Sequence, residues 1–268
     1  MKLAVVGHVE WIEFLRVESV PRPGDIVGAQ ETWEEPGGGG GVAAAELARL
    51  AGECSLYCLL GGDELGTRAR KELEAVSVRV LAPKSGDELQ RRGFVYIDDA
   101  GERTITIIGD KPRPKGGEGT VPWEKLDDVD GVYFTAGDAE AVRQARRARV
   151  LVATARELPT LHAAGVELDA LVASGEDDAE RYQTGDLDPP PKLVVSTAGA
   201  LGGWAQPGGP YKPAVPAGPY EDAYGAGDCF AAGLTYALAK GMDVGDALTF
   251  ASERGALALT RRGAGLKG

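Results

Sequence analysis

The residues with the clearest capacity for chemistry form the run Gly225, Ala226, Gly227 and Asp228, directly before a long apolar segment. The glycines allow a tight turn, and the apolar segment predicts a helix that continues to Lys240. A glycine-rich turn at a helix N-terminus points several free N–H groups at one spot, and the helix dipole adds partial positive charge there. The run therefore predicts an anion site suited to a transferring phosphoryl group.

Asp228 has two interpretations on these four residues alone. A carboxylate in the first turn of the helix can accept a proton from a substrate hydroxyl while the turn holds a phosphate in line. An aspartate at the same place can instead serve only as a helix cap. The run does not decide between a catalytic base and a cap.

The overall charge narrows the classes of partner. The 268 residues carry a formal net charge of −12, and a chain of this sign is repelled by nucleic acid backbones. No window approaches the roughly 18 apolar residues of a membrane span, and the N-terminal apolar run is too short for a signal peptide. We therefore expect a cytoplasmic protein with no nucleic acid or membrane partner, in which a local site holds any phosphorylated ligand.

A zinc site and a disulfide framework have little support in the sequence. The three cysteines, Cys54, Cys58 and Cys229, show no repeating spacing, and only His8 and His162 are available to complete a zinc site. An odd number of cysteines argues against a disulfide framework. We expect the cysteines to be small buried hydrophobic residues.

Short apolar runs alternate with helical patterns along the chain. They predict strands at Lys2–Gly7, Glu10–Val17, Ser55–Leu60, Val132–Phe134, Val150–Thr154, Leu171–Ala173 and Leu193–Ser196. Two further runs, Gly93–Asp98 and Arg103–Ile108, flank the turn DAGE and predict a β-hairpin. Strands that alternate with helices predict βαβ units in a parallel sheet, which binds ligands at the carboxyl ends of its strands.

Two glycine-rich stretches interrupt this pattern. The run PGGGGG at 36–41 is expected to lack regular structure because five glycines lose much backbone entropy on ordering. A strong helix former follows it and ends at Gly52. The Pro- and Gly-rich stretch at 199–219 is expected to be a mobile loop.

The segment Asp222–Gly233 reads D-x-x-G-A-G-D-x-F-x-x-G and resembles the C-terminal signature of the ribokinase-like (PfkB) carbohydrate kinase family. Other segments resemble the family's motifs in the same order: PGGGGGVAAAELARLAG, GGDELG, GERTI, VVSTAGALGG and TFASERGALALTRRGA. The resemblance spans nearly the whole chain. It implies one α/β domain over 1–268, a three-layer sandwich with a mainly parallel central sheet. It also implies a small β lid formed by about 9–35 and 91–109.

The resemblance also implies an activity and a site. ATP donates its γ-phosphoryl group to a hydroxymethyl group of a small polyhydroxylated substrate, with Asp228 as base and Gly225, Ala226 and Gly227 as anion hole. The ATP-binding residues would be Thr197, Gly199, Gly202 and Ser252. The substrate would meet Glu10, Gly38, Gly39 and Arg103, and Mg2+ would lie near Glu176 and Asp177. A potassium ion, sought near Asp222 and Gly263, and a homodimer through the lid are left open.

The chain departs from the family at positions that grip a sugar. The usual aspartate and asparagine fall on Ile12 and Val42, and neither side chain can hydrogen-bond a hydroxyl. The metal-side motif N-x-x-E reads Ser174 to Asp177. These changes put the acceptor in doubt, because a site that hydrogen-bonds a hydroxyl discriminates strongly for it.

Several nearby residues have both a functional and a structural interpretation. Glu10 and Glu13 either replace the lost sugar contacts or form a solvated strand face. Arg103 either reaches an acidic or phosphorylated substrate or is an exposed hairpin arginine. His8 either contacts substrate or is structural. Trp11 and Trp33 either stack on a base or sugar ring or pack within the lid.

Three functions compete on this reading. The first is a sugar kinase, with a nucleoside kinase as a close variant. The second is a non-catalytic or regulatory protein that keeps the fold, since fold alone does not fix function. The third, an oxidoreductase, is excluded because no G-x-G-x-x-G follows the first strand.

Overall fold

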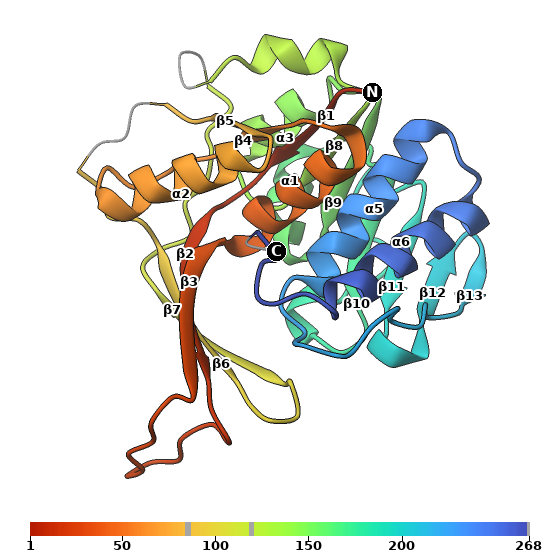
Figure 1. Ribbon diagram of the computed structural model, residues 1–268. Coiled ribbons are helices and arrows are strands. Elements are labelled where there is room, and N and C mark those ends of the chain that lie inside the picture. The colour runs from red at the N-terminus through yellow and green to blue at the C-terminus, as the bar shows by residue number, and fades with distance from the viewer. Residues whose placement is uncertain (84–86, 118–120, 267–268) are drawn as a thin grey trace.

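The computed structural model describes residues 1–83, 87–117 and 121–266. The chain forms two sheets (Figure 1). The large sheet and the helices around it make up the body, and the small sheet projects from one end of it. The expected α/β fold with a mainly parallel sheet and a smaller β element is confirmed.

The large sheet has nine strands in the described part of the chain. In spatial order they are β13 (Gly209–Tyr211), β12 (Gly203–Gln206), β11 (Val194–Thr197), β10 (Ala170–Ser174), β9 (Val150–Thr154), β8 (Gly131–Phe134), β1 (Leu3–Val6), β4 (Cys54–Tyr57) and β5 (Val78–Leu81). All neighbours from β11 to β5 are parallel, and only β12 and β13 pair antiparallel at one edge.

Helices cover both faces of this sheet. One face carries α1 (Gly38–Ala51), α2 (Glu64–Ala75), α5 (Ala226–Lys240) and α6 (Val244–Ala258), and the other carries η1 (Trp123–Asp128), α3 (Ala139–Ala145) and α4 (Leu158–Ala164). Strand β1 shows why helices are needed on both faces of the sheet. Its apolar residues point alternately into the two hydrophobic cores. Leu3 and Val5 pack into the first and Ala4 and Val6 into the second.

The small sheet has the order β3 (Glu31–Gly37), β2 (Glu10–Arg16), β6 (Arg92–Ile97) and β7 (Arg103–Ile108). Two antiparallel pairs, β2 with β3 and β6 with β7, are joined by the parallel pair of β2 and β6. The predicted hairpin is therefore present. One face of the sheet packs its apolar residues, including Phe14 and Val95, against Tyr224 of the body. Strand β7, at one edge of this sheet, is exposed along its length.

The glycine run at 36–41 corrects the sequence expectation of irregular structure. Strand β3 ends at Gly37, and Gly38 to Gly41 form the first turn of α1. A Cβ on Gly40 would lie 2.6 Å from the backbone oxygen of His8. The glycines are needed for close approach between the helix and the end of β1, so tertiary packing outweighs their backbone entropy.

The stretch 199–219 also differs from the expected loop. It contains the short helix η4 (Gly199–Leu201) and the edge strands β12 and β13. These strands extend the sheet beyond β11 with antiparallel pairing. The short strands with a Gly-Pro-rich turn between them gave too little periodicity to indicate a hairpin.

The three cysteines are buried, as expected for small hydrophobic residues. Burial raises the pKa of the Cys58 thiol to about 12, opposed by Arg70. Burial likewise raises the pKa of the Cys54 and Cys229 thiols. All three thiols are therefore protonated near neutral pH.

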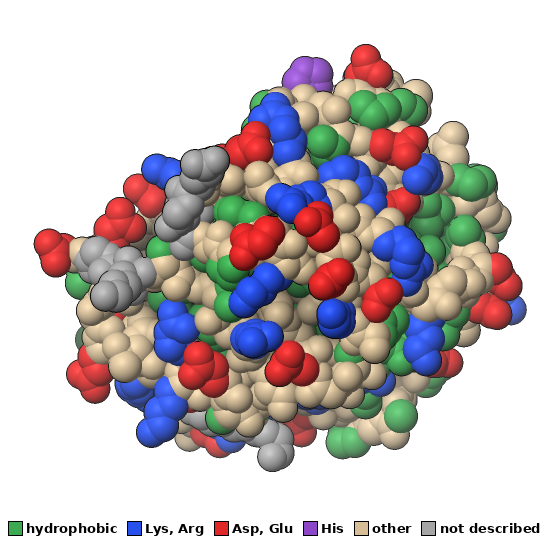
Figure 2. Space-filling view, turned by 90° about the horizontal axis from the view of Figure 1, so that it is seen from above, with side chains coloured by type: hydrophobic (Ala, Val, Ile, Leu, Met, Phe, Trp, Pro, Cys, Tyr) green, Lys and Arg blue, Asp and Glu red, His purple; other side chains and the backbone are tan. Residues whose placement is uncertain are grey.

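The described ranges contain no helix that is long and apolar enough to cross a membrane. On the face shown in Figure 2, basic and acidic side chains are interspersed rather than gathered by sign. This face therefore offers no single-sign field to a highly charged partner.

Candidate active site

The site lies where the order of the large sheet reverses. Strand β1 has β4 on one side and β8 on the other, and the chain visits β4 first and β8 much later. Loops leave the carboxyl ends of β1 and β8 in opposite directions at such a point, which opens a crevice. His8 follows β1 and Thr135 follows β8, so both side chains stand at this crevice.

The N-termini of α1 and α5 meet at the same place. A Cβ on Gly39, in the first turn of α1, would lie 2.8 Å from Asp228 Oδ1 and 2.8 Å from Thr135 Oγ1. Any side chain at position 39 would therefore press on the carboxylate. The predicted residues Gly38, Gly39 and Asp228 are brought together, and Thr135 joins them.

The turn before α5 has the expected geometry. Gly225 has φ +75°, a left-handed conformation that favours glycine, and no side chain caps this end of the helix. Space around a Cβ on Gly227 is open. With no side-chain cap, the first-turn N–H groups of this 15-residue helix stay available to an anion. The helix ends at Lys240 as predicted, with Gly241 in the left-handed region.

Asp228 lies in an environment that disfavours its charge. Burial raises the pKa of its carboxyl to about 6, and the negative charges of Glu180 and Glu10 act in the same direction. Arg103 and Arg156 oppose the shift. A carboxyl with a pKa of about 6 is ionised near neutral pH and still basic enough to accept a proton.

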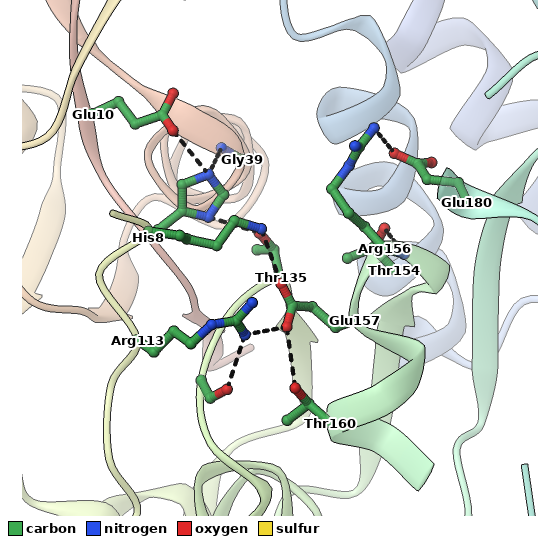
Figure 3. A network of polar contacts seen from close by, with 12 residues as sticks. His8, Glu10, Gly39, Arg113, Thr135, Thr154, Arg156, Glu157, Thr160 and Glu180 are labelled. Carbon is green, nitrogen blue, oxygen red and sulfur yellow. Dashed lines mark hydrogen bonds and ion pairs between the residues drawn. The ribbon is translucent and has the colours of Figure 1, made fainter. Parts of the chain in front are cut away.

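His8 links Glu10 and the start of α1 to Thr135 at the end of β8 (Figure 3). Its Nε2 lies 3.4 Å from the Gly39 N and 3.6 Å from a Glu10 oxygen, and its Nδ1 lies 3.4 Å from Thr135 Oγ1. Burial and then the charges of Lys111 and Arg91 hold the His8 pKa well below its usual range. His8 is therefore a neutral imidazole near pH 7.

Glu10 is not part of a solvated strand face, so that interpretation is wrong for this residue. Its side chain is buried and pairs with Arg91 at 2.8 Å. Burial raises the Glu10 pKa, opposed by Arg91 and Lys111. Glu13, by contrast, is partly exposed and pairs with Arg92.

The tryptophans pack within the protein. Trp11 is completely buried, with the Arg68 guanidinium 4.3 Å above its ring. Trp33 stacks on Phe14 with ring centroids 4.8 Å apart, and Arg262 lies 3.8 Å from its other face. The structural interpretation is the one that the geometry favours, because these contacts occupy the ring faces.

Apolar side chains occupy the two positions where the family has sugar-gripping groups. Ile12 and Val42 are buried in one cluster, with Cys229 beneath the start of α5. Val42 Cγ1 lies 2.8 Å from where a Cβ on Gly225 would be, and Ile12 Cδ1 lies 2.8 Å from that of Gly93. The floor of the crevice is therefore apolar beside the anion turn.

Arg103 links the small sheet to the body. Its Nη1 donates to the Ala223 oxygen at 3.0 Å, just before the anion turn. Its charge also lowers the Asp228 pKa. Among the described residues it forms no ion pair with a carboxylate, so its charge stays available to a ligand.

A cluster of charged residues beyond His8 was missed by the sequence analysis. Lys111 Nζ lies 2.9 Å from one oxygen of Glu157, and Arg113 pairs with the other oxygen. Thr160 also donates to Glu157 at 3.3 Å. Figure 3 shows Arg113, Glu157 and Thr160 on the far side of His8 and Thr135. The segment KPRPK, which follows the hairpin, was the available signal.

The predicted nucleotide residues form a separate group at the end of β11. The Thr197 hydroxyl donates to the Ala173 oxygen at 3.3 Å, and the Ala198 N donates to the Gly202 oxygen at 2.8 Å. Gly202 has φ +87°, and a Cβ there would lie 2.2 Å from the Tyr211 oxygen. A tight loop results, with Gly199 exposed at its start. Ser252 lies on α6, buried, and its hydroxyl has no hydrogen-bond partner among the described residues.

The two residues expected near magnesium, Glu176 and Asp177, differ in their exposure and in their ion pairs. Asp177 accepts from Arg156 at 2.7 Å, and bonds from the Ala179 N and then Arg156 lower its pKa. Glu180 shares the same guanidinium. Glu176 is exposed, and its carboxylate lies 3.4 Å from where a Cβ on Gly199 would be.

These carboxylates suit an Mg2+ ion that is bound mostly through water molecules. Within 1–83, 87–117 and 121–266, no three His, Cys, Asp or Glu residues form a preformed metal cluster. Magnesium usually keeps several waters and binds one or two carboxylates together with substrate phosphates. Glu176, exposed beside the loop after β11, has the oxygen ligands that such an ion prefers.

The Asp222 carboxylate joins the two segments near which the sequence analysis placed a possible potassium ion. Its oxygens accept from the Tyr224 N and the Gly263 N, each at 2.8 Å. Burial raises the Asp222 pKa in spite of these bonds. The carboxylate thus fixes the segment that leads into the anion turn.

The glycine turn before α5, the raised pKa of Asp228 and the glycine-rich loop after β11, all on a doubly wound sheet, are typical of a phosphotransferase with an alcohol group as acceptor. The sequence matches the pfkB family of carbohydrate kinases over residues 1–155 and 139–267. The chain belongs to this family.

Individual relatives agree with this assignment. The chain is 28% identical, over 98% of its length and 94% of the relative, to an ATP-dependent ribose-1-phosphate kinase from Halopiger xanaduensis. The fold is similar to that of ribokinase from Thermotoga maritima, with a TM-score of 0.77 at 19% identity, covering 98% and 94% of the two chains. Adenosine kinase from Sinorhizobium meliloti gives a TM-score of 0.78 at 18% identity, covering 98% and 95%.

Proposed function

We propose that this protein transfers the γ-phosphoryl group of ATP to a hydroxymethyl group of a small sugar or sugar derivative, with Asp228 as the general base. The observation that carries the proposal is the position of Asp228. Its carboxyl has a pKa of about 6 and lies in the first turn of α5, beside an open anion turn. A carboxylate that served only as a cap would be expected to keep a low pKa, because a cap accepts N–H bonds in its charged form.

The residues divide the work of the reaction. Gly225, Ala226 and Gly227 bind the γ-phosphoryl oxygens, where negative charge accumulates in the transition state. Asp228 accepts the proton of the acceptor hydroxyl as its oxygen bonds to the γ-phosphorus. The bond from the γ-phosphorus to the bridging oxygen breaks, and ADP leaves with that electron pair.

The nucleotide is held by the second group. Thr197, Gly199 and Gly202 bind the phosphate and ribose side of ATP, and Ser252 on α6 offers its unpaired hydroxyl to the nucleotide. Glu176 would hold Mg2+ beside this loop, and the ion would supply positive charge to the phosphates when bound with ATP. The small sheet, with Arg103 at its contact to the body, closes over the acceptor and excludes water, which limits ATP hydrolysis.

The acceptor class follows from two observations. The apolar floor at Ile12 and Val42 lacks the groups that hold a polyol in this family. The relative from Halopiger xanaduensis is named for a sugar phosphate. We therefore rank a phosphorylated pentose above a free sugar as the first acceptor to test. The packed Trp11 removes one ring that would have favoured a nucleoside.

The test is ADP release from Mg-ATP across sugars, sugar phosphates, sugar acids and nucleosides, for the wild type and Asp228→Asn. We expect acceptor-dependent turnover that the substitution reduces by about 10²- to 10⁴-fold. An absence of acceptor-dependent turnover despite measurable ATP binding would contradict the proposal and favour a binding role.

A further inference from the structure

Two cations share one carboxylate at the edge of the acceptor crevice. Lys111 and Arg113 both pair with Glu157, whose side chain is 1% exposed. Two positive charges against one negative charge leave a net charge of +1. The Lys111 side chain is 17% exposed and that of Arg113 is 45% exposed, so both remain within reach of a ligand.

The neighbouring arginines do not carry the same surplus. Arg156 pairs with both Asp177 and Glu180, and Arg91 pairs with Glu10. Their charges are already matched by carboxylates. The positive charge without a matching carboxylate therefore lies at the Lys111–Arg113 pair and at Arg103, which contacts the segment before α5 on the other side of the crevice.

This pair lies on the acceptor side of the catalytic carboxylate. The charges of Lys111 and Arg113 both act on His8. His8 contacts the Gly39 N, and a Cβ on Gly39 would lie 2.8 Å from Asp228 Oδ1. His8 also contacts Thr135 at 3.4 Å, and Figure 3 shows Arg113 and Glu157 beyond Thr135. The cation pair and the start of α1 next to Asp228 therefore lie on opposite sides of His8. The nucleotide loop at Thr197 lies elsewhere, at the end of β11.

We propose that Lys111 and Arg113 form an anion seat that binds a phosphomonoester on the acceptor, while the acceptor's hydroxymethyl group reaches Asp228. This inference rests on the proposed kinase function and names its substrate class. Glu157 holds the two cations in place. Neutral His8 contacts the sugar ring, between its phosphate and the reacting hydroxyl.

The chemistry of the seat suits a phosphate more closely than a hydroxyl. A guanidinium presents a planar fork of donors to phosphate oxygens, and an ammonium adds a compact charge. A phosphomonoester carries a charge near −2 at neutral pH. Binding it offsets the surplus of the seat and replaces the polyol contacts absent at Ile12 and Val42.

The experiment compares ribose 1-phosphate, ribose and ribonate as acceptors at saturating Mg-ATP. The variants are Lys111→Gln, Arg113→Gln and the charge-keeping Arg113→Lys. Lys192→Gln is the matched control, because Lys192 also binds two carboxylates, Glu167 and Asp169, but precedes β11 at the opposite end of the sheet. Thermal melting shows that each variant is folded.

We expect the wild type to prefer ribose 1-phosphate. Each Gln variant should raise the KM for ribose 1-phosphate roughly 10- to 100-fold, as expected for loss of a charge-assisted hydrogen bond. The kcat, the KM for ATP and the KM for ribose should change little. Arg113→Lys should recover part of the loss, and Lys192→Gln should behave as the wild type.

Other results separate the two proposals. A wild type that prefers ribose, or Gln variants that keep the preference for ribose 1-phosphate, would overturn the seat and leave the kinase intact. A preference for ribonate would overturn the phosphomonoester assignment. If no acceptor is turned over, the kinase proposal fails, and calorimetric titration with ribose 1-phosphate decides the seat. Binding weakened by Lys111→Gln would support it, and no binding to the wild type would overturn it.

Discussion

Two carboxylates at the helical face of the sheet have opposite surroundings. Glu46 in α1 is fully buried and pairs with Arg49, Arg254 and Arg261. Burial alone would raise its pKa, but the bonds from Arg261 and Arg254 lower it. Burial also acts on Asp228, but no arginine in the described ranges donates a hydrogen bond to it, and its pKa rises to about 6.

The difference separates stability from function. Glu46 joins α1 to α6 and the segment after it, and its charge is fully compensated. Asp228 is held among groups that disfavour its charge, which makes the carboxylate a better base at the cost of folding free energy. Natural active sites commonly show this trade-off. The predictions below test the contrast from the largest expected effect to the smallest.

Replacing the base should have the largest effect on activity. Asp228→Asn should lower kcat by about 10²- to 10⁴-fold, because the acceptor proton then has no base. Glu46→Gln should keep its turnover per folded molecule. Steady-state ADP release, normalised to folded protein, measures both. Equal losses in the two variants would remove the distinction between them.

Replacing the structural carboxylate should have the largest effect on stability. Glu46→Gln leaves the buried ends of Arg254 and Arg261 without their anion and should lower the free energy of unfolding by about 3–5 kcal/mol. Urea unfolding followed by circular dichroism measures this change. Lys192→Gln removes the two ion pairs of an exposed lysine, is the control and should cost about 1 kcal/mol.

The close approach at Gly39 should matter for rate more than for stability. A Cβ there would press on Asp228 Oδ1 and Thr135 Oγ1, both ends of side chains that can shift. Gly39→Ala should lower kcat about 10²-fold, as a displacement of a reacting group does. A Gly39→Ala enzyme with wild-type kcat would show that this approach has no catalytic importance. Gly41→Ala, in the same turn of α1, is the comparison, because a Cβ there would meet only Leu73 Cδ2 at 3.9 Å.

The smallest expected effect is a gain in stability. The pKa of Asp228 is raised on folding, so the folded state disfavours the ionised form. This cost is absent below a pH of about 3.8, grows as pH rises through about 6 and is complete above it. Asp228→Asn should therefore be more stable than the wild type at pH 8, by at most about 3 kcal/mol at 1.36 kcal/mol per pKa unit. At pH 4 the gain should be nearly absent; a gain independent of pH would mean that the charge is not its cause.

The sequence predicted those parts of the site that are local in the chain. The anion turn, Asp228 and the helix to Lys240 lie within sixteen consecutive residues, and their glycine and apolar patterns are typical of such a structure. The alternating strands and helices likewise predicted the parallel sheet. Lys111 and Arg113 could not be found in this way, because their role depends on Glu157, which is distant in the chain and has no periodic signal.

The glycine run at 36–41 shows a second limit. Glycine entropy predicts irregular structure, but here the deciding fact is the crowding of Gly39 and Gly40 against Asp228, Thr135 and His8. That crowding exists only in the folded chain. The interpretation of Glu10 as part of a solvated strand face failed for the same reason, since its partner Arg91 directly precedes β6.

The most direct test of the role of Asp228 is the pH dependence of kcat/KM at saturating Mg-ATP, measured with ribose as well as ribose 1-phosphate. Ribose is included because its hydroxyls do not titrate between pH 4 and 9, whereas a phosphomonoester has a second pKa near 6. We predict that kcat/KM rises with pH through an apparent pKa of about 6 with both acceptors. The residual activity of Asp228→Asn should lack this rise with ribose. A wild-type profile with ribose that is flat between pH 5 and 8, or a rise that persists in Asp228→Asn, would contradict the assignment of Asp228 as the base.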